Sequence, residues 1–150
     1  SSDLVEGDWV QTFDDEFDDS KLDESKWNNF GPNYYDKRTH WSKDNLLVGD
    51  GVAKLHFEKK AGHQNDDSKG AETPYACGFM ETYGKWVQRY GYFEARVKLP
   101  TAPGLWPAFW LMPDRGAAAA SSRRLRLHLR RLGGGNHDAR KLRGLRARNV

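Results

Sequence analysis

The chain has 150 residues, a formal net charge of +3, and 6 Trp, 6 Tyr and 7 Phe. This length suits one domain, the single cysteine Cys77 excludes an intramolecular disulfide framework, and no apolar run is long enough for a transmembrane helix. No signal peptide is predicted within these residues.

Charge divides the chain into two segments. Residues 1–115 hold 14 Lys/Arg and 20 Asp/Glu, whereas residues 116–150 hold 10 Lys/Arg and one acid, Asp138. Every aromatic residue also lies in 1–115, and aromatic side chains supply much of a domain's buried area. We therefore predict a folded body over 1–115 and an Arg/Ala/Leu/Gly-rich tail over 116–150 that is disordered or frameshifted.

The first predicted strands of the body form a hairpin. Asp50-Gly51 separates the largely apolar residues 45–48 from residues 52–58. Asp-Gly between two such runs is typical of a tight turn in which both residues have positive φ. Within 52–58, Ala53, Leu55 and Phe57 alternate with polar side chains, which indicates a strand with one buried and one wet face.

Further strands are predicted toward the end of the body. Residues 60–75 are polar and read as a loop, 77–83 could form a strand, and 90–99 alternate with Phe93, Ala95, Val97 and Leu99 on one face. Residues 105–112 are apolar on both faces, which predicts a central strand. Short strands and turns without a helical period favour an antiparallel β-sandwich or barrel.

Residues 105–112 also carry the clearest candidate binding site. A period of two places Trp106 and Trp110 on one face, with the small Ala108 between them. Two large aromatic rings arranged in this way could stack on flat ligands such as sugar rings. The alternative is that both tryptophans are ordinary core residues, the commoner use of large aromatics.

Other polar clusters fit ordinary structural roles better than metal sites. The acidic residues 14–19 lack the offsets of an EF-hand loop, and His40, His56 and His63 lack zinc-ligand spacing. Cys77 is expected to be a small buried residue. In the tail, residues 123–132 alternate leucine with charge, a pattern that could bind phosphates of nucleic acid or an anionic membrane surface.

Several stretches of the body, taken in order, resemble glycoside hydrolase family 16, the laminarinase, agarase, porphyranase and lichenase group. They are residues 13–17, 22–27, 45–58, 78–82, 90–100 and 104–113, the last containing Trp-Pro-Ala-Phe-Trp. The resemblance covers roughly residues 9–115, the N-terminal half of the family's domain. It implies an all-β fold, a two-sheet antiparallel β-jelly-roll sandwich of the lectin and glucanase kind, here incomplete.

The same resemblance implies a set of substrate-binding residues. At least one of Trp106 and Trp110 is expected to line the cleft, and Glu81 lies where lichenase-like members use a glutamate to hold a sugar hydroxyl. Tyr34 and Arg38 fall in a loop that edges the non-reducing-side subsites in relatives. No catalytic residue is assigned, because the family's Glu-x-Asp-x-x-Glu motif is absent after Pro113.

The missing motif decides between the functions that the resemblance implies. The family hydrolyses O-glycosidic bonds of β-linked polysaccharides by a retaining mechanism, which needs two carboxyl groups, but only Asp138 follows Asp114. We therefore expect an endo-β-glycanase lineage whose present chain is inactive, with a frameshift near residues 114–120 as the explanation. The alternatives are a non-catalytic lectin-like β-sandwich and a basic-tail binder of nucleic acid or membranes.

The resemblance also sets expectations about partners. The partner is a polysaccharide, with no nucleic acid and no membrane, and the chain is a monomer. No cofactor is required, although structural calcium occurs in the family. A polymeric substrate implies a secreted or extracellular protein, with the periplasm as the alternative compartment.

Overall fold

The computed structural model describes residues 8–33, 38–112, 126–131 and 140–149. Within these ranges the chain forms β-strands and two short 3-10 turns, which confirms the expected all-β fold. No helix in the described ranges is long and apolar enough to cross a bilayer. The strands of the first half are β1 (Val10–Asp15), β2 (Thr39–Trp41), β3 (Leu46–Gly49), β4 (Val52–Leu55), β5 (Phe57–Glu58) and β6 (Gly62–His63).

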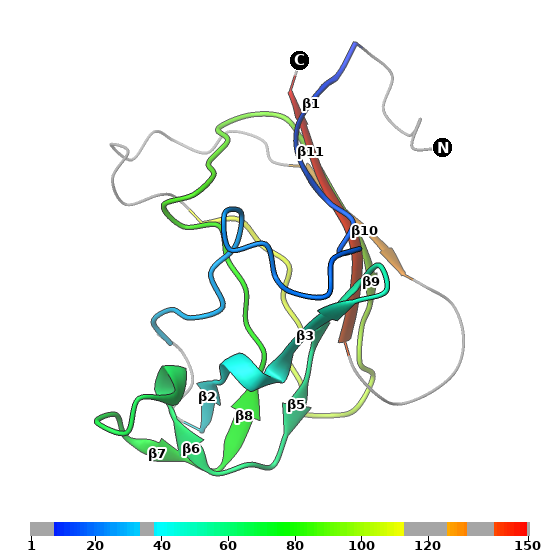
Figure 1. The fold of residues 1–150 in the computed structure, drawn as a ribbon. Coiled ribbons are helices and arrows are strands. Elements are labelled where there is room, and N and C mark those ends of the chain that lie inside the picture. The colour runs from blue at the N-terminus through cyan, green and yellow to red at the C-terminus, as the bar shows by residue number, and fades with distance from the viewer. Residues whose placement is uncertain (1–7, 34–37, 113–125, 132–139, 150) are drawn as a thin grey trace.

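The remaining elements follow in the second half. They are β7 (Glu72–Thr73), β8 (Tyr75–Cys77), β9 (Tyr92–Lys98), β10 (Arg126–Arg131) and β11 (Arg140–Asn149), with the turns η1 (Lys43–Asn45) and η2 (Gln64–Asp66). A six-stranded sheet has the order β10-β9-β11-β4-β3, with β1 paired to β11. A second sheet has the order β2-β8-β5, and β6 pairs with β7. Figure 1 shows the two small sheets gathered at one end of the molecule and β1, β9, β10 and β11 at the other.

The predicted hairpin is confirmed. Strands β3 and β4 pair antiparallel from Leu46 opposite Leu55 to Gly49 opposite Val52. The turn residues Asp50 and Gly51 have φ of 53° and 69°, the left-handed values that favour Asp-Gly at this place. The Gly51 N–H also donates to the Phe17 carbonyl at 3.0 Å, so the turn is fastened to the N-terminal segment.

The alternation predicted around β9 builds the core. Phe93, Ala95 and Val97 are buried and pack with Ala53 of β4 and with three aromatics of the N-terminal segment, Phe13, Phe17 and Trp27. Leu99, predicted to share that face, is exposed because it lies beyond the end of β9.

One carboxylate organises the aromatic part of this core. The rings of Phe13 and Trp27 meet edge to face with centroids 5.3 Å apart. Asp15 accepts the Trp27 indole N–H at 2.7 Å and the Phe17 backbone N–H at 2.8 Å. The second bond supports the φ of 59° at Phe17, a left-handed value that is uncommon for a large side chain. Part of the acidic run is thus structural.

The predicted central strand over 105–112 is wrong. These residues form no strand, and the positions beside β9 are taken by β10 on one edge and by β11 on the other. The segment 105–112 therefore lies outside the large sheet.

Two other boundaries differ from the prediction. The strand expected over 77–83 ends at Cys77. At the next residue, Gly78, the chain passes so close to the end of η1 that an added Cβ would lie 2.2 Å from the Asn45 carbonyl oxygen, so glycine is required there. Beyond it, only Glu81 pairs, through an isolated antiparallel bridge with Asn28. The polar stretch 60–75 is more ordered than a plain loop, since it contains β6, η2 and β7.

The two C-terminal strands lie inside the large sheet. Strand β11 pairs antiparallel with β9, β4 and β1, and β10 pairs parallel with β9. Residues 126–131 and 140–149 of the tail, which was expected to be disordered or frameshifted over 116–150, form strands; leucine alternates with charge in 126–131, whereas the pairing of 140–149 shifts register between Arg143 and Leu145. The boundary at Gly116 and the frameshift hypothesis stay predictions.

Candidate functional site

The segment 105–112 presents its two tryptophans to solvent. Trp106 is 81% exposed and Trp110 is 51% exposed, and Met112 on the same face is 50% exposed. On the opposite face Phe109 and Leu111 pack against the core cluster. Ala108 lies exposed between the two indoles, so the face predicted from a period of two exists even though the strand does not. We call Trp106, Ala108, Trp110 and Met112 the indole strip; its tryptophans are not core residues.

Glu81 is held next to the segment that follows Trp27. Its backbone N–H donates to the Asn28 carbonyl at 2.9 Å, and its carbonyl accepts the Asn28 N–H at 2.7 Å. The Asn28 side-chain amide adds a bond to the Tyr83 carbonyl at 2.9 Å. Partial burial raises the pKa of the Glu81 carboxyl group, because the charged form loses hydration.

Gly31 lets the Glu81 carboxylate and an aromatic ring approach the backbone closely. A Cβ at position 31 would lie 2.9 Å from the Phe79 ring and 3.1 Å from Glu81 Oε1. The Phe79 ring in turn stacks on Trp41, with centroids 4.9 Å apart and planes 11° apart. No local sequence pattern pointed to this pair, since Trp41 and Phe79 are far apart in the chain.

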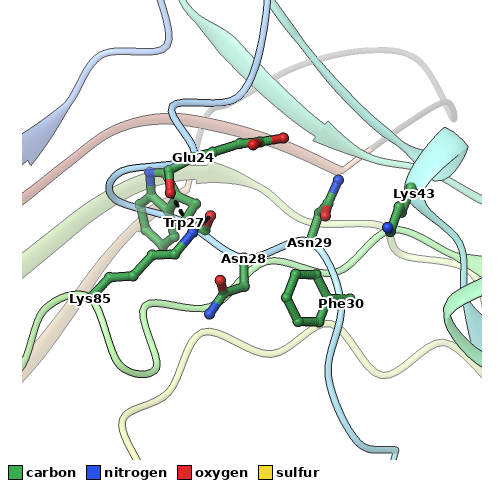
Figure 2. A pocket seen from close by; sticks show the side chains of 7 residues that line it. All are labelled: Glu24, Trp27, Asn28, Asn29, Phe30, Lys43 and Lys85. Carbon is green, nitrogen blue, oxygen red and sulfur yellow. Dashed lines mark hydrogen bonds between the residues drawn. The ribbon is translucent and has the colours of Figure 1, made fainter.

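A pocket of about 330 Å³ opens beside this region. Its walls come from the N-terminal segment, from η1 and from the loop after Glu81, through Glu24, Trp27, Asn28, Asn29, Phe30, Lys43 and Lys85 (Figure 2). A pocket with an aromatic ring and several hydrogen-bonding groups suits a small polar ligand such as a sugar. Neighbouring sequence motifs gave no signal for it, because its lining comes from three separate segments.

Two lysines define the pocket's edges. The Lys85 ammonium donates to the backbone carbonyls of Glu24 and Trp27, which ties the two loops together. The Lys43 ammonium lies 5.6 Å from the centroid of the Phe30 ring, within the range of a cation–π contact. Phe30 itself is 49% exposed, so one face of its ring remains accessible. Figure 2 shows Phe30 between Asn28 and Lys43.

The structure separates the other predicted site residues from this pocket. Trp106, Trp110, Glu81 and Arg38 are not among the residues that line it, although Glu81 reaches its edge through Asn28. Arg38 is exposed just before β2. Tyr34 lies outside the described residues.

The histidines and the cysteine have structural surroundings. His40 is 1% exposed, its Nδ1 lies 2.8 Å from Thr73 Oγ1, and burial lowers the pKa of its imidazole. Cys77 is buried, as predicted. Among the residues that the structure describes, no group of three His, Cys, Asp or Glu side chains could hold a metal ion. Structural calcium stays a prediction.

Comparisons with known proteins agree with the fold. The family described as "Glycosyl hydrolases family 16" matches residues 33–121. The chain is 30% identical over 128 residues to the endo-1,3-1,4-beta-glycanase EglC of Rhizobium meliloti (strain 1021), covering 71% of this chain and 27% of the relative. It is 35% identical over 114 residues to a beta-glucanase of Rhodothermus marinus, covering 71% of this chain and 37% of that enzyme.

A solved structure gives the same result. The laminarinase catalytic domain from Thermotoga maritima MSB8 matches with a TM-score of 0.54 and 28% sequence identity, over 65% of this chain and 41% of that one. The matched region therefore spans well under half of each of these relatives.

Proposed function

Because the chain belongs to glycosyl hydrolase family 16, we propose that its body is the glycan-binding part of a β-glucan endo-hydrolase. The relatives named above are a 1,3-1,4-β-glycanase, a β-glucanase and a laminarinase, which supports a β-linked glucan as the ligand. The corresponding reaction is retaining hydrolysis of O-glycosidic bonds. A polymeric glucan as substrate favours a location of the protein outside the cytoplasm.

We propose further that this chain binds the glycan without cleaving it. Retaining hydrolysis needs a nucleophilic carboxylate and a second carboxyl group about 5–5.5 Å away that protonates the leaving oxygen. The Glu-x-Asp-x-x-Glu motif that would supply both is absent from these 150 residues. Glu81 alone, even with its raised pKa, could not act as nucleophile and acid in the same step.

The observation that carries the proposal is the indole strip. Its two tryptophans are held outward by an opposite face that packs on the core, so the rings are presented at no cost in core packing. A sugar ring that covers about 100 Å² of indole surface would gain roughly 2.5 kcal/mol at 25 cal/mol per Å². Two such contacts sum to about 5 kcal/mol, equal to a Kd of about 0.2 mM before the cost of association is subtracted, so stacking on the strip gives weak binding that polar contacts must supplement.

Glu81 supplies the polar part of the proposed binding face. Its half-buried carboxyl group lies beside the Asn28 bridge and accepts hydrogen bonds from sugar hydroxyls when ionised. Arg38 and Tyr34 are proposed to edge the same face. A hydrogen bond to an ionised carboxylate contributes about 1.5–3 kcal/mol, against about 0.5–1.5 kcal/mol for a neutral one.

Affinity electrophoresis beside a reducing-sugar assay tests the proposal. The purified chain should be retarded in gels that contain laminarin or lichenan, and should release no reducing sugar from either. Replacement of both Trp106 and Trp110 by alanine should abolish the retardation. Normal mobility of the unmodified chain in every glycan gel would refute the binding function, and steady release of reducing sugar would refute the loss of catalysis.

A further inference from the structure

The short turn η2 binds two separate main-chain segments, at residue 31 and at residues 41–43, with three consecutive side chains. Asn65 Oδ1 accepts the Gly31 N–H at 3.0 Å, and Asn65 Nδ2 donates to the Gly31 carbonyl at 3.2 Å. Gln64 donates to the same carbonyl at 2.7 Å and accepts the Trp41 N–H at 3.0 Å. Asp66 accepts the Lys43 N–H at 2.8 Å.

Each of these segments carries a side chain of the candidate site. Gly31 follows Phe30, whose ring lines the pocket, and Lys43 brings its ammonium over that ring. Trp41 provides the ring that stacks on Phe79. The amide of Asn65 pairs with both backbone groups of Gly31, as a neighbouring strand would, so residues 30–31 are fixed without belonging to a strand.

The backbone of η2 takes a left-handed conformation at two residues. Asn65 and Asp66 have φ of 59° and 58°, values that Asn and Asp adopt more readily than other residues with side chains but that still need supporting contacts. Strained backbone persists where the surrounding contacts fix it, and such places concentrate at ligand sites. Here the fixing contacts are the hydrogen bonds to residues 31 and 43.

We infer that the pocket takes part in glycan binding and that Gln64, Asn65 and Asp66 are positioning residues for it: they hold the backbone that places Phe30 and Lys43 in the pocket wall and Trp41 against Phe79. This inference rests on the proposed glycan-binding function. It adds residues that touch no ligand themselves and act through the backbone of residues 31, 41 and 43. A turn that served only to reverse the chain would not affect glycan affinity.

Substitution by glycine removes the side-chain hydrogen bonds of η2 without placing a residue that resists positive φ at these positions. Asn65→Gly and Asp66→Gly both remove the side chain and ease the backbone strain, because glycine adopts these φ values freely. Asp66→Asn keeps an oxygen for the Lys43 N–H and should restore binding. Asp67→Ala is the matched control, since it removes a bond from Asp67 Oδ1 to the Lys69 N–H at 3.1 Å within the same loop.

Laminarin affinity is measured by affinity electrophoresis for the wild type and each variant, with thermal unfolding as the check on folding. Loss of one or two neutral hydrogen bonds should weaken binding about three- to tenfold in Asn65→Gly and Asp66→Gly. Asp66→Asn and Asp67→Ala should stay within about twofold of the wild type. Hydrogen exchange should show the Gly31 amide losing protection in Asn65→Gly, and the Lys43 amide in Asp66→Gly.

The outcomes separate the two proposals. A wild-type chain that does not bind laminarin would refute the proposed function, and with it this inference. Binding by the wild type that Asn65→Gly and Asp66→Gly leave unchanged, while the two amides lose protection, would refute the inference alone. Equal weakening by Asp67→Ala would also refute it, since the hydrogen bond of that side chain goes to the Lys69 N–H within its own loop.

Discussion

Replacing Gly31 by alanine tests the close approach that shapes the site. The added Cβ would lie 2.9 Å from the Phe79 ring and 3.1 Å from Glu81 Oε1, closer than side-chain carbons normally come. Overpacking of this kind costs about 1–3 kcal/mol, and alanine returns about 0.4–1 kcal/mol by restricting the unfolded chain. We therefore expect Gly31→Ala to lower the free energy of unfolding by about 1–2 kcal/mol.

Urea denaturation followed by tryptophan fluorescence measures this loss, and a thermal melt should show a fall in Tm of about 3–8 °C. Gly70→Ala is the matched control, because its nearest neighbour to an added Cβ is the Asp67 carbonyl at 3.4 Å, an ordinary contact. That variant should be as stable as the wild type or slightly more stable. Gly31→Ala with unchanged stability, or a larger loss in Gly70→Ala, would refute the steric argument.

Three further predictions concern the strip, the core and acid stability. Trp106→Ala should weaken laminarin binding by up to about seventyfold in affinity electrophoresis, the loss of about 2.5 kcal/mol of stacking. Tm should stay unchanged, because this side chain is 81% exposed; a lower Tm with intact binding would contradict this. Asp15→Ala should lower the free energy of unfolding, measured by urea denaturation, by about 2–4 kcal/mol, because the Trp27 indole N–H loses its acceptor. Asp15→Asn should lower it by less. Burial lowers the pKa of His40, so the unfolded chain binds a proton at this imidazole more readily than the folded chain does. The contribution of His40 to stability is therefore complete above about pH 6.5 and is lost as the pH falls below that value. His40→Gln should flatten this dependence of the free energy of unfolding on pH, and an unchanged dependence would show that another group is responsible.

Local sequence patterns predicted the parts of the fold that depend only on residues close together in the chain. The Asp50-Gly51 turn follows from the φ values that two residues must adopt, and the buried face of β9 follows from alternation. The strand expected over 105–112 could not be excluded in this way, because the strands that lie beside β9 come from later in the chain.

The same distinction between local patterns and contacts across the fold applies to the candidate site. The shared face of Trp106 and Trp110 was predicted from a period of two, but the spacing left open whether that face points outward or into the core. The pocket and its turn η2 were missed, because Gly31 and Asn65 meet only after two distant loops fold together. Polar loop residues such as Gln64 and Asn65 carry no pattern that distinguishes a contact across the fold from a contact with water.

A fluorescence titration with laminarin oligosaccharides tests most directly whether the indole strip is a sugar platform. With 81% of Trp106 exposed, a sugar that covers its ring should shift the tryptophan emission to shorter wavelength in a saturable way. The shift should be strongly reduced in Trp106→Ala and absent when Trp110 is replaced as well. A saturable shift that survives both replacements, or no shift at any oligosaccharide concentration, would contradict the account.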